Sequence, residues 1–302
     1  MELIFLGTSA MVPTKERNHQ SIYLDLGKEA ILLDCGEGTQ RQIQFAKLTP
    51  NKIKKILISH WHGDHVAGLI GLFQTIGSFA EEDRNIKLYG PKGSKKYVEH
   101  LFQSAAFDKK LDVEVIELNS EELKTFYENQ DYKLQFINLE HSIPTIGFKF
   151  VRKSKIKISK LKLDKLGIKE GPILKELQNG NDITYQNKKI KVDDVASRIP
   201  EKSISFVFDT KLCDACFEIA KDSEYLISEA VYEKDMEDKA EQYKHMTCTQ
   251  AAQIASMSNV KKLILTHFSQ RYKTTEQLEQ QAKDIFPETT CAYDLMKVKI
   301  NF

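Results

Sequence analysis

The sequence predicts an α/β protein in which sheets are flanked by helices. Short β-rich runs alternate with helical patterns along the chain, and both halves run from strand to helix. The 302 residues, with a mass of 34.7 kDa, suit one large domain or two small ones. With 41% hydrophobic and 29% charged residues and a mean hydropathy of −0.41, the composition is that of an ordinary globular protein and excludes a disordered one.

The first half is predicted to contain most of the strands. Short runs of apolar, β-branched and aromatic residues mark each of them, and a tight turn at Gly27-Lys28-Glu29 joins the second to the third. Strands are expected at 2–7, 21–26, 30–34, 54–59, 86–89, 113–118, 133–139 and 145–151. Apolar residues at helical spacing predict helices at 66–79 and 94–105.

The same alternation returns after residue 203. Strands are expected at 204–208, 225–228, 262–266 and 295–300, and helices at 212–221, 249–257 and 275–283. No short-period repeat is present in the sequence.

Residues 152–202 differ from both flanks. They are rich in lysine, contain several Gly, Pro and Asn positions, and show little periodicity beyond a possible short helix. More than about 15 residues without clear core-forming structure indicate a functional protrusion or a linker. We interpret this segment as an insertion between the two halves.

The charge balance is uneven along the chain. The 44 basic and 43 acidic residues give a net charge of +1, but 152–165 alone carry +6 and leave −5 for the rest. This run is either a solvated surface or a polyanion-binding arm on an acidic body. Its basic residues are Arg152, Lys153, Lys155, Lys157, Lys160, Lys162 and Lys165.

The cysteine content and the hydropathy pattern bear on location. An odd number of scattered cysteines indicates a reducing compartment, so we expect a cytoplasmic protein. No apolar run approaches the roughly 18 residues of a membrane helix, and the first eight residues indicate a strand rather than a signal peptide.

The pair Cys213-x-x-Cys216 opens a helical pattern without a second pair, which favours a structural role over a redox or zinc site. The five cysteines are Cys35, Cys213, Cys216, Cys248 and Cys291.

The strongest chemical signal is the segment Ser59-His60-Trp61-His62-Gly63-Asp64-His65. A strand is expected to end here, and the polar turn to the next helix brings four potential ligands into one small volume. Neutral imidazoles and a carboxylate are what Zn²⁺ and similar borderline ions bind. Trp61 offers no metal ligand, so we assign it to packing.

Further histidines and an aspartate also follow expected strands. His141, Asp209 and His267 each lie at or just after a strand end. Ligands placed after several separate strands can meet at one edge of a sheet, where sites in α/β proteins commonly form. His19 and His100 stand apart from this pattern, and we interpret both as structural.

The His-x-His-x-Asp-His cluster with the later ligands resembles the metallo-β-lactamase superfamily of two-metal hydrolases. Within it, the chain resembles the short form of the tRNase Z family, the tRNA 3′-processing endoribonucleases, over nearly its whole length. The resemblance implies a four-layer αβ/βα sandwich over residues 1–302, with 152–202 as an inserted flexible arm. Besides the metal cluster, the motifs that carry it are, in order, Phe5-Leu6-Gly7-Thr8-Ser9, Pro13-Thr14-Lys15-Glu16-Arg17-Asn18, Leu33-Asp34-Cys35-Gly36-Glu37-Gly38-Thr39-Gln40, Gly167-Ile168-Lys169-Glu170-Gly171-Pro172 and Leu265-Thr266-His267-Phe268-Ser269-Gln270-Arg271-Tyr272.

The resemblance implies two Zn²⁺ ions per subunit, with Mn²⁺ or Co²⁺ as possible substitutes. Spacing alone does not say which ligand holds which ion. Two cations about 3.5–4 Å apart can lower the pKa of a bridging water to near 7 and stabilise both oxygens of an in-line displacement. One implied ligand set is His60, His62, His141 and Asp209, and the other is Asp64, His65, His267 and the same Asp209.

The family also uses a glutamate and a histidine beyond the metals. These match Glu229 and His245, so the resemblance implies that His245 protonates the leaving 3′-oxygen while Glu229 orients its ring. Asp64 completes the catalytic set. The chain has Ser228 where the family has a histidine, so Ser228 cannot take that residue's role, and Met246 where the family has a serine.

The resemblance implies precursor tRNA as substrate. Lys15 and Arg17 are expected near the acceptor end, and the arm, with Gly171 and Pro172, is expected to grip the tRNA body through phosphates and shape. The cut follows the discriminator base and leaves a 3′-hydroxyl on the tRNA and a 5′-phosphate on the trailer. A homodimer, in which each subunit lends its arm to the other's site, is also implied.

Three alternatives stay open at the level of sequence. The first keeps the fold but hydrolyses a small phosphodiester, a thioester or a lactone. The second is a diiron oxidoreductase of the same fold. Such proteins have a His-x-Glu pattern at the position where this chain has His60-x-His62, which makes this alternative less favoured. The third is a non-catalytic RNA-binding protein with a structural metal. Structural zinc usually has a closed set of four ligands, whereas seven candidates point to two open sites.

Overall fold

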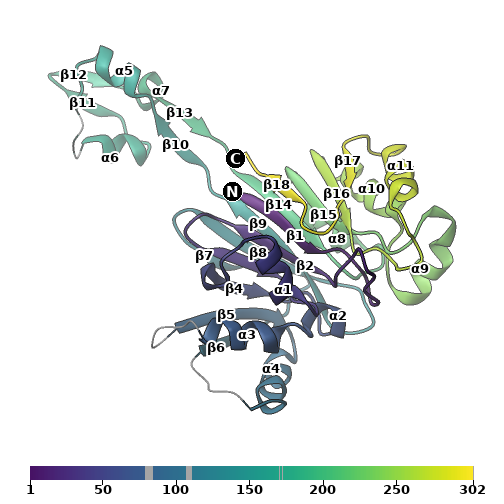
Figure 1. Ribbon diagram of the computed structural model, residues 1–302. Helices are drawn as coiled ribbons and strands as arrows, with labels where there is room; N and C mark the ends of the chain where they lie inside the picture. Colours follow the sequence, from purple (N-terminus) through teal and green to yellow (C-terminus); the bar gives the residue numbers. More distant parts are fainter. Residues whose placement is uncertain (79–83, 107–110, 170, 172, 302) are drawn as a thin grey trace.

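Two seven-stranded sheets form the body of the molecule (Figure 1). The structure, a computed structural model, describes residues 1–78, 84–106, 111–169, 171 and 173–301. In spatial order, the first sheet is β18 (Lys297–Lys299), β1 (Glu2–Gly7), β2 (Ser21–Asp25), β3 (Ala30–Leu33), β4 (Ile53–Leu57), β5 (Arg84–Pro91) and β6 (Leu111–Leu118). The second is β17 (Thr289–Cys291), β16 (Lys262–Thr266), β15 (Tyr225–Glu229), β14 (Lys202–Val207), β9 (Thr145–Arg152), β8 (Tyr132–Leu139) and β7 (Lys124–Glu128).

Each sheet combines an antiparallel part with a parallel part. In the first sheet β3, β4, β5 and β6 are parallel. In the second sheet β14, β15, β16 and β17 are parallel. Because parallel strands all end at the same edge of their sheet, the residues that follow them come close together.

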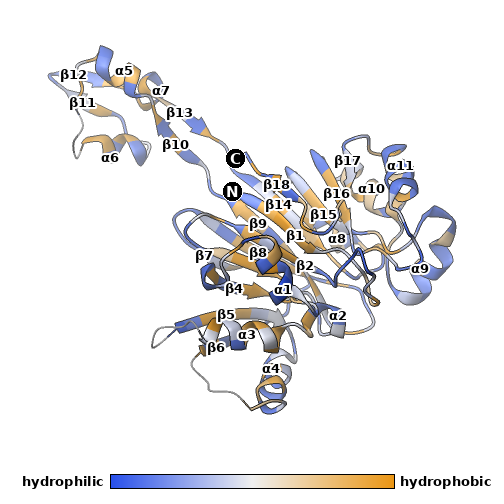
Figure 2. Cartoon of the chain, in the orientation of Figure 1, coloured by the Kyte–Doolittle hydropathy of each residue, from blue (hydrophilic) through white to orange (hydrophobic). Residues whose placement is uncertain are grey.

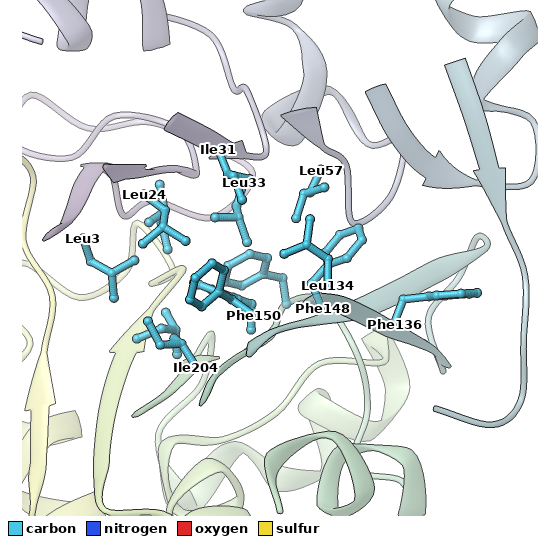
Figure 3. Close-up of a cluster of buried hydrophobic side chains, with 14 of the residues drawn as sticks. Leu3, Leu24, Ile31, Leu33, Leu57, Leu134, Phe136, Phe148, Phe150 and Ile204 are labelled. Carbon is cyan, nitrogen blue, oxygen red and sulfur yellow. The ribbon is translucent and has the colours of Figure 1, made fainter. Parts of the chain in front are cut away.

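Hydrophobic side chains fill the space between the two sheets (Figure 3). Leu24 and Leu33 of the first sheet face Phe148 and Phe150 of the second, and all four are at most 3% exposed. Full burial of such a side chain contributes about 1.5–3 kcal/mol. The sheets therefore pack face to face around one common core.

Helices cover the outer face of each sheet (Figure 1). Over the first sheet, α3 presents Leu69, Leu72, Phe73 and Ile76, which recur at helical spacing. Helices α8, α10 and α11 share a second outer core with β15 and β16. The body helices are α1 (Thr39–Phe45), η1 (Pro50–Lys52), α2 (Gly63–Val66), α3 (Leu69–Ser78), α4 (Ser94–Gln103), α8 (Asp214–Ala220), η2 (Lys234–Met236), α9 (Glu237–Tyr243), α10 (Cys248–Met257) and α11 (Glu276–Lys283).

These four layers confirm the α/β class and the four-layer sandwich that the resemblance implied. Figure 2 shows hydrophobic residues concentrated on the strands inside the body and hydrophilic ones on its surface. Among the helices in the described ranges, none is both long and apolar enough to cross a bilayer.

The inserted segment projects from the body as a separate lobe (Figure 1). It leaves and returns at neighbouring positions, because Arg152 of β9 pairs with Lys202 of β14. It has its own small core, in which Leu177 and Val195 are fully buried. Its elements are β10 (Lys155–Ile158), α5 (Lys160–Lys165), α6 (Ile173–Gln178), β11 (Ile183–Tyr185), β12 (Lys188–Ile190), α7 (Val192–Val195) and β13 (Ala196–Ile199).

Several expected elements differ from those in the structure. The lobe contains two strand pairs and three short helices, so the expectation of little regular structure there is wrong. Within the expected helix at 66–79, only α3 from Leu69 on is the predicted helix, and Val66 is the last residue of a separate short helix, α2. Between them Gly68 lies so close to another segment that a Cβ atom would be 2.1 Å from the carbonyl oxygen of Gly36. Position 79 of that expected helix lies outside the described residues.

The sequence patterns missed α1, β7, α9 and β17 in the body. Each of these elements spans only three to seven residues. Such lengths hold too few residues for a helical or strand period to stand out.

Candidate metal centre

The edge at which the parallel strands end carries a cluster of imidazoles and carboxylates. One loop follows β4, and the other segments follow β8, β14 and β16. The structure brings together all seven side chains predicted to be metal ligands. They are His60, His62, Asp64, His65, His141, Asp209 and His267.

A first group of ligand atoms converges from three loops. His60 Nε2 lies 3.0 Å from His62 Nδ1, which in turn lies 3.3 Å from His141 Nε2. The Oδ2 atom of Asp209 is 3.5 Å from His60 Nε2. One ligand atom from each of these four residues lies within 4.8 Å of all the others. This spacing suits a single cation in their midst.

A second group lies on the other side of Asp209. His65 Nε2 lies 3.1 Å from His267 Nε2, which is 3.4 Å from Asp64 Oδ2. The Oδ1 atom of Asp209 is 3.3 Å from His65 Nε2. The two oxygens of Asp209 therefore face different groups of potential ligands.

The unsatisfied atoms of the cluster fit a bound metal ion. Asp209 Oδ1 and His267 Nδ1 lie 3.3 Å apart, yet both are buried without a hydrogen-bond partner. A buried polar atom left in this state costs about 1–3 kcal/mol, and a cation supplies the missing partner.

The protonation of three of the imidazoles also fits a metal ion. Burial lowers the pKa of His60, His62 and His141, so these rings are neutral and keep a lone pair. Burial opposes ionisation of Asp64 too, but hydrogen bonds from His267 and His65 outweigh it and hold the carboxyl pKa below its ordinary value. Neutral imidazoles and ionised carboxylates are the ligand forms that a metal requires.

The backbone at the ends of the strands is strained. Asp34 has a φ of 54°, Asp209 of 23° and His267 of 58°. Residues with side chains adopt such conformations at a cost of order 1–3 kcal/mol, and they cluster at active sites. The strain at Asp209 and His267 accompanies the placement of both side chains in the cluster.

Asp34 contacts the cluster, although the sequence patterns did not select it as a site residue. Its Oδ2 atom is 2.7 Å from His65 Nδ1 and accepts a hydrogen bond of 2.8 Å from the Ser59 hydroxyl. Its Oδ1 atom accepts the backbone N–H of Ser59 at 2.7 Å. A carboxylate that holds the far nitrogen of a ligand fixes the ring and its tautomer. The signal was present, since Asp34 ends the strand next to the one that precedes the histidine cluster.

The predicted pair Glu229 and His245 lies beside the cluster. His245 Nδ1 is 3.2 Å from Glu229 Oε1 and 3.8 Å from Asp209 Oδ2. Glu229 is fully buried and accepts the backbone N–H groups of Thr210 at 2.8 Å and Met246 at 3.1 Å. Burial lowers the pKa of His245, but the charge and hydrogen bond of Glu229 outweigh it and raise this pKa to about 9.

The helix that follows His245 fixes its loop. Thr247 is the N-cap of α10, and its side chain accepts the Gln250 backbone N–H while Gln250 reaches back to the Thr247 backbone. This capping box is encoded locally by the T-x-x-Q pattern. On the other side, Lys244 takes a left-handed conformation and its carbonyl lies 2.8 Å from His141 Nδ1.

A cavity of about 880 Å³ opens over the cluster. Its rim combines apolar and aromatic groups with cations. Met11 is 77% exposed and Tyr243 55% exposed, and Lys239 and Arg271 also line the opening. A volume of this size is typical of ligand pockets in proteins.

The four predicted substrate contacts occupy different environments. Lys15 and Gly171 are exposed, the latter on the inserted lobe, and Pro172 lies outside the described residues. Arg17 is 8% exposed, and its guanidinium donates to the carbonyl oxygens of Ser269 at 3.3 Å and Tyr272 at 2.5 Å. Arg17 therefore ties its loop to the segment after His267, and its contact with RNA stays a prediction.

Comparisons with known proteins agree with this geometry. The family described as "Anti-Pycsar protein Apyc1" matches residues 1–164. Ribonuclease Z of Methanothermobacter thermautotrophicus is 37% identical over 302 residues, which cover 99% of this chain and 97% of the relative. Ribonuclease Z of Bacillus cereus is 38% identical over 304 residues, with 98% of each chain covered.

Solved structures give the same result. The crystal structure of human tRNase Z, short form, superposes with a TM-score of 0.73 at 26% identity and covers all of both chains. A metallo-β-lactamase fold protein from Bacillus subtilis, 16% identical with a TM-score of 0.70, shares the fold. With relatives of this identity matched from end to end, the chain belongs to the ribonuclease Z family.

Proposed function

We propose that this protein is a metal-dependent endoribonuclease that removes the 3′ trailer from precursor tRNA. The observation that carries the proposal is the position of Asp209. It lies between two groups of metal ligands and 3.8 Å from His245, in a chain whose relatives are named Ribonuclease Z. The cut follows the discriminator base and leaves a 3′-hydroxyl on the tRNA.

The proposed cofactor is a pair of Zn²⁺ ions. His60, His62 and His141 would hold one of them, Asp64, His65 and His267 would hold the other, and Asp209 would be shared between the two. When bound, the pair activates the attacking water and neutralises charge on the phosphoryl oxygens. Imidazole and carboxylate ligands also suit Mn²⁺ and Co²⁺, so these ions are expected to substitute.

His245 is the proposed general acid. Its ring lines the cavity over the cluster, and Glu229 holds the Nδ1 side of the ring. Nε2 is therefore free to donate its proton to the leaving 3′-oxygen of the tRNA. Glu229 does not line the cavity, because it is fully buried beneath the ring, and it acts by positioning His245 and favouring its charged form.

The rim of the cavity is the proposed site for the nucleotides beside the cut. Lys239 and Arg271 supply positive charge for phosphates, and Tyr243 exposes a ring on which a base can stack. Lys15 is exposed on a neighbouring loop and is proposed to contact the acceptor end, with Arg17 supporting the loop from below.

The lobe at 152–202 is proposed to bind the tRNA body. Its lysines at 155, 157, 160, 162 and 165 all lie in exposed positions. Phosphate contacts of this kind position a structured RNA without reading its sequence. We further propose a homodimer, in which the lobe of one subunit holds the tRNA that the other subunit cleaves.

The test is cleavage of a 5′-labelled precursor tRNA with and without a chelator, with the product sized to one nucleotide. We expect one cut after the discriminator base that disappears with chelator and returns with Zn²⁺. An Asp209→Asn variant is expected to lose the cut. If the metal-loaded protein hydrolyses bis(p-nitrophenyl) phosphate but leaves precursor tRNA intact, the tRNA assignment is wrong and a small phosphodiester is the substrate.

A further inference from the structure

Two cysteines lie close together beside the metal centre. The Sγ atoms of Cys213 and Cys216 are 3.6 Å apart, and both thiols are free. Cys213 is partly exposed, whereas Cys216 is fully buried against the outer core of the second sheet. The proposed nuclease reaction uses neither of them.

A metal site does not account for the pair. In the part of the chain that the structure describes, each cluster of three or more potential ligands belongs to the centre at Asp209, and none includes a cysteine. Two thiols at this distance have a second chemistry available, which is formation of a disulfide.

The loop before the pair belongs to the active site. It begins at Asp209 and continues through Thr210, whose hydroxyl is 3.9 Å from Cys213 Sγ. The backbone N–H of Thr210 donates to Glu229, the residue that holds His245. The next residue, Lys211, donates its N–H to the carbonyl of Glu140, which precedes the ligand His141. Cys213 therefore contacts the loop at Thr210, and the backbone of Thr210 and Lys211 links that loop to Glu229 and Glu140.

The two thiols are chemically unequal. A hydrogen bond from Cys216 lowers the pKa of Cys213 to about 6, while the same interaction and burial raise the pKa of Cys216. The partly exposed sulfur is thus the thiolate, and the buried one keeps its proton. An accessible thiolate with a protonated partner is the arrangement of a reactive dithiol.

We propose that Cys213 and Cys216 form a reversible thiol–disulfide site, oxidised by low-molecular-weight disulfides, whose oxidation displaces the Asp209–Cys213 loop. The thiolate of Cys213 attacks one sulfur of the small disulfide and releases one small thiolate. Cys216 then gives up its proton and attacks Cys213 Sγ, which releases the second small thiolate. Two protein thiols and one small disulfide become one protein disulfide and two small thiols, so atoms and electrons balance.

The sulfurs are too far apart for a bond, so at least one of the two cysteines must move. A disulfide bond is about 2.05 Å long, so the sulfurs have to approach by about 1.5 Å. Cys216 lies within α8 and is packed on all sides, whereas Cys213 precedes the helix in an extended conformation with a φ of −147°. Cys213 is therefore the residue that shifts, and it takes its contact with Thr210 with it.

The test treats the metal-loaded, full-length protein with glutathione disulfide and blocks remaining thiols before mass analysis of its peptides. We expect a Cys213–Cys216 disulfide that dithiothreitol reverses, and mixed glutathione adduct at Cys213 in a Cys216→Ser variant. A Cys291→Ser variant, changed at a distant cysteine, is expected to react like the parent chain. A Cys213→Ser variant is expected to form no such disulfide.

The effect on the centre is measured on the same samples. The rate of metal release to a chelator is expected to rise on oxidation in the parent chain and to stay constant in Cys213→Ser. Cleavage of precursor tRNA, which rests on the proposed function, is expected to fall by about tenfold to hundredfold, since a misplacement of about 1 Å can cost about 10²-fold. Absence of the Cys213–Cys216 disulfide, or its formation without a change in metal release, overturns the proposal. Disulfide formation and metal release test the proposal even if the protein does not cleave tRNA.

Discussion

The Nδ1 atom of His245 lies 3.2 Å from Oε1 of Glu229, a carboxylate with no exposed surface that also accepts two backbone N–H groups. These N–H groups come from the segments that follow β14 and precede α10. Glu229 therefore sets the position of the His245 ring relative to Asp209. Its orientation is fixed by the protein before any substrate arrives.

Replacing His245 by asparagine is expected to lower the single-turnover rate of tRNA cleavage by about 10²–10⁴-fold, the usual contribution of a positioned general acid. The KM is expected to change little, because the proton is delivered only in the transition state. His100→Asn is the matched control, since His100 is exposed on α4 away from the cluster. A His245→Asn rate within a factor of a few of the parent rate contradicts the role.

Replacing Asp34 by asparagine is expected to weaken metal binding by about 10–100-fold, because His65 loses the carboxylate that holds its ring. Metal affinity is measured by competition with a chromogenic chelator. Asp112→Asn serves as the control, because Asp112 is an exposed residue that contacts Asn85. Equal affinities of the Asp34→Asn and Asp112→Asn variants show that Asp34 does not support the ligand.

The inserted lobe is expected to be removable without loss of the body. Because Arg152 and Lys202 pair across neighbouring strands, an Asn-Gly turn can join them as a hairpin in place of residues 153–201. The shortened protein is expected to hydrolyse bis(p-nitrophenyl) phosphate at the parent rate and to bind tRNA more weakly. The slope of log affinity against log salt is expected to fall by about 0.7–0.9 for each lost phosphate contact. Unchanged tRNA affinity and slope rule out the lobe as an RNA-binding arm.

Tyr243 is expected to act in substrate binding. Replacing this exposed ring by alanine is expected to raise the KM for precursor tRNA by about tenfold or more, since stacking on an aromatic residue is worth about 1–3 kcal/mol per base. Tyr243→Phe keeps the ring and is expected to behave like the parent chain. The KM of each variant is measured by steady-state kinetics. An equal KM for Tyr243→Ala and Tyr243→Phe excludes stacking at this position.

Asp294 is expected to make stability depend on pH. Burial raises its pKa to about 6 from the ordinary 3.8, against hydrogen bonds from Asn18 and Thr8. Between these two values the folded state keeps the proton and the unfolded state releases it. The contribution of Asp294 to the free energy of unfolding is therefore largest below pH 4 and falls by about 2–3 kcal/mol as the pH rises past 6.

The measurement is urea unfolding of the parent chain and of Asp294→Asn at pH 4, 5, 6 and 7. The difference between the two free energies removes the contribution of every other group. The parent chain is expected to lose stability relative to Asp294→Asn as the pH rises. A difference that stays constant across this range means that the carboxyl titrates normally.

Local patterns identified most of the body strands and the segment that begins at His60, because short apolar runs and ligand-type residues are visible without knowledge of their neighbours. They also indicated that His141, Asp209 and His267 follow strands. The class of sheets flanked by helices followed from the same alternation. Periodicity failed for the lobe at 152–202, since its elements are three to six residues long and each is stabilised by contacts with the others.

What the sequence determined by itself is therefore the inventory of chemistry: imidazoles and carboxylates at strand ends, a lysine-rich insertion and a fold of alternating strands and helices. The tertiary structure decided how these groups meet. It placed Asp34 behind His65, buried Arg17 beneath its loop, and broke the expected helix at Gly68, where the backbone of Gly36 leaves no room for a side chain. Each of these outcomes depends on atoms from distant segments that come into contact only when the chain has folded.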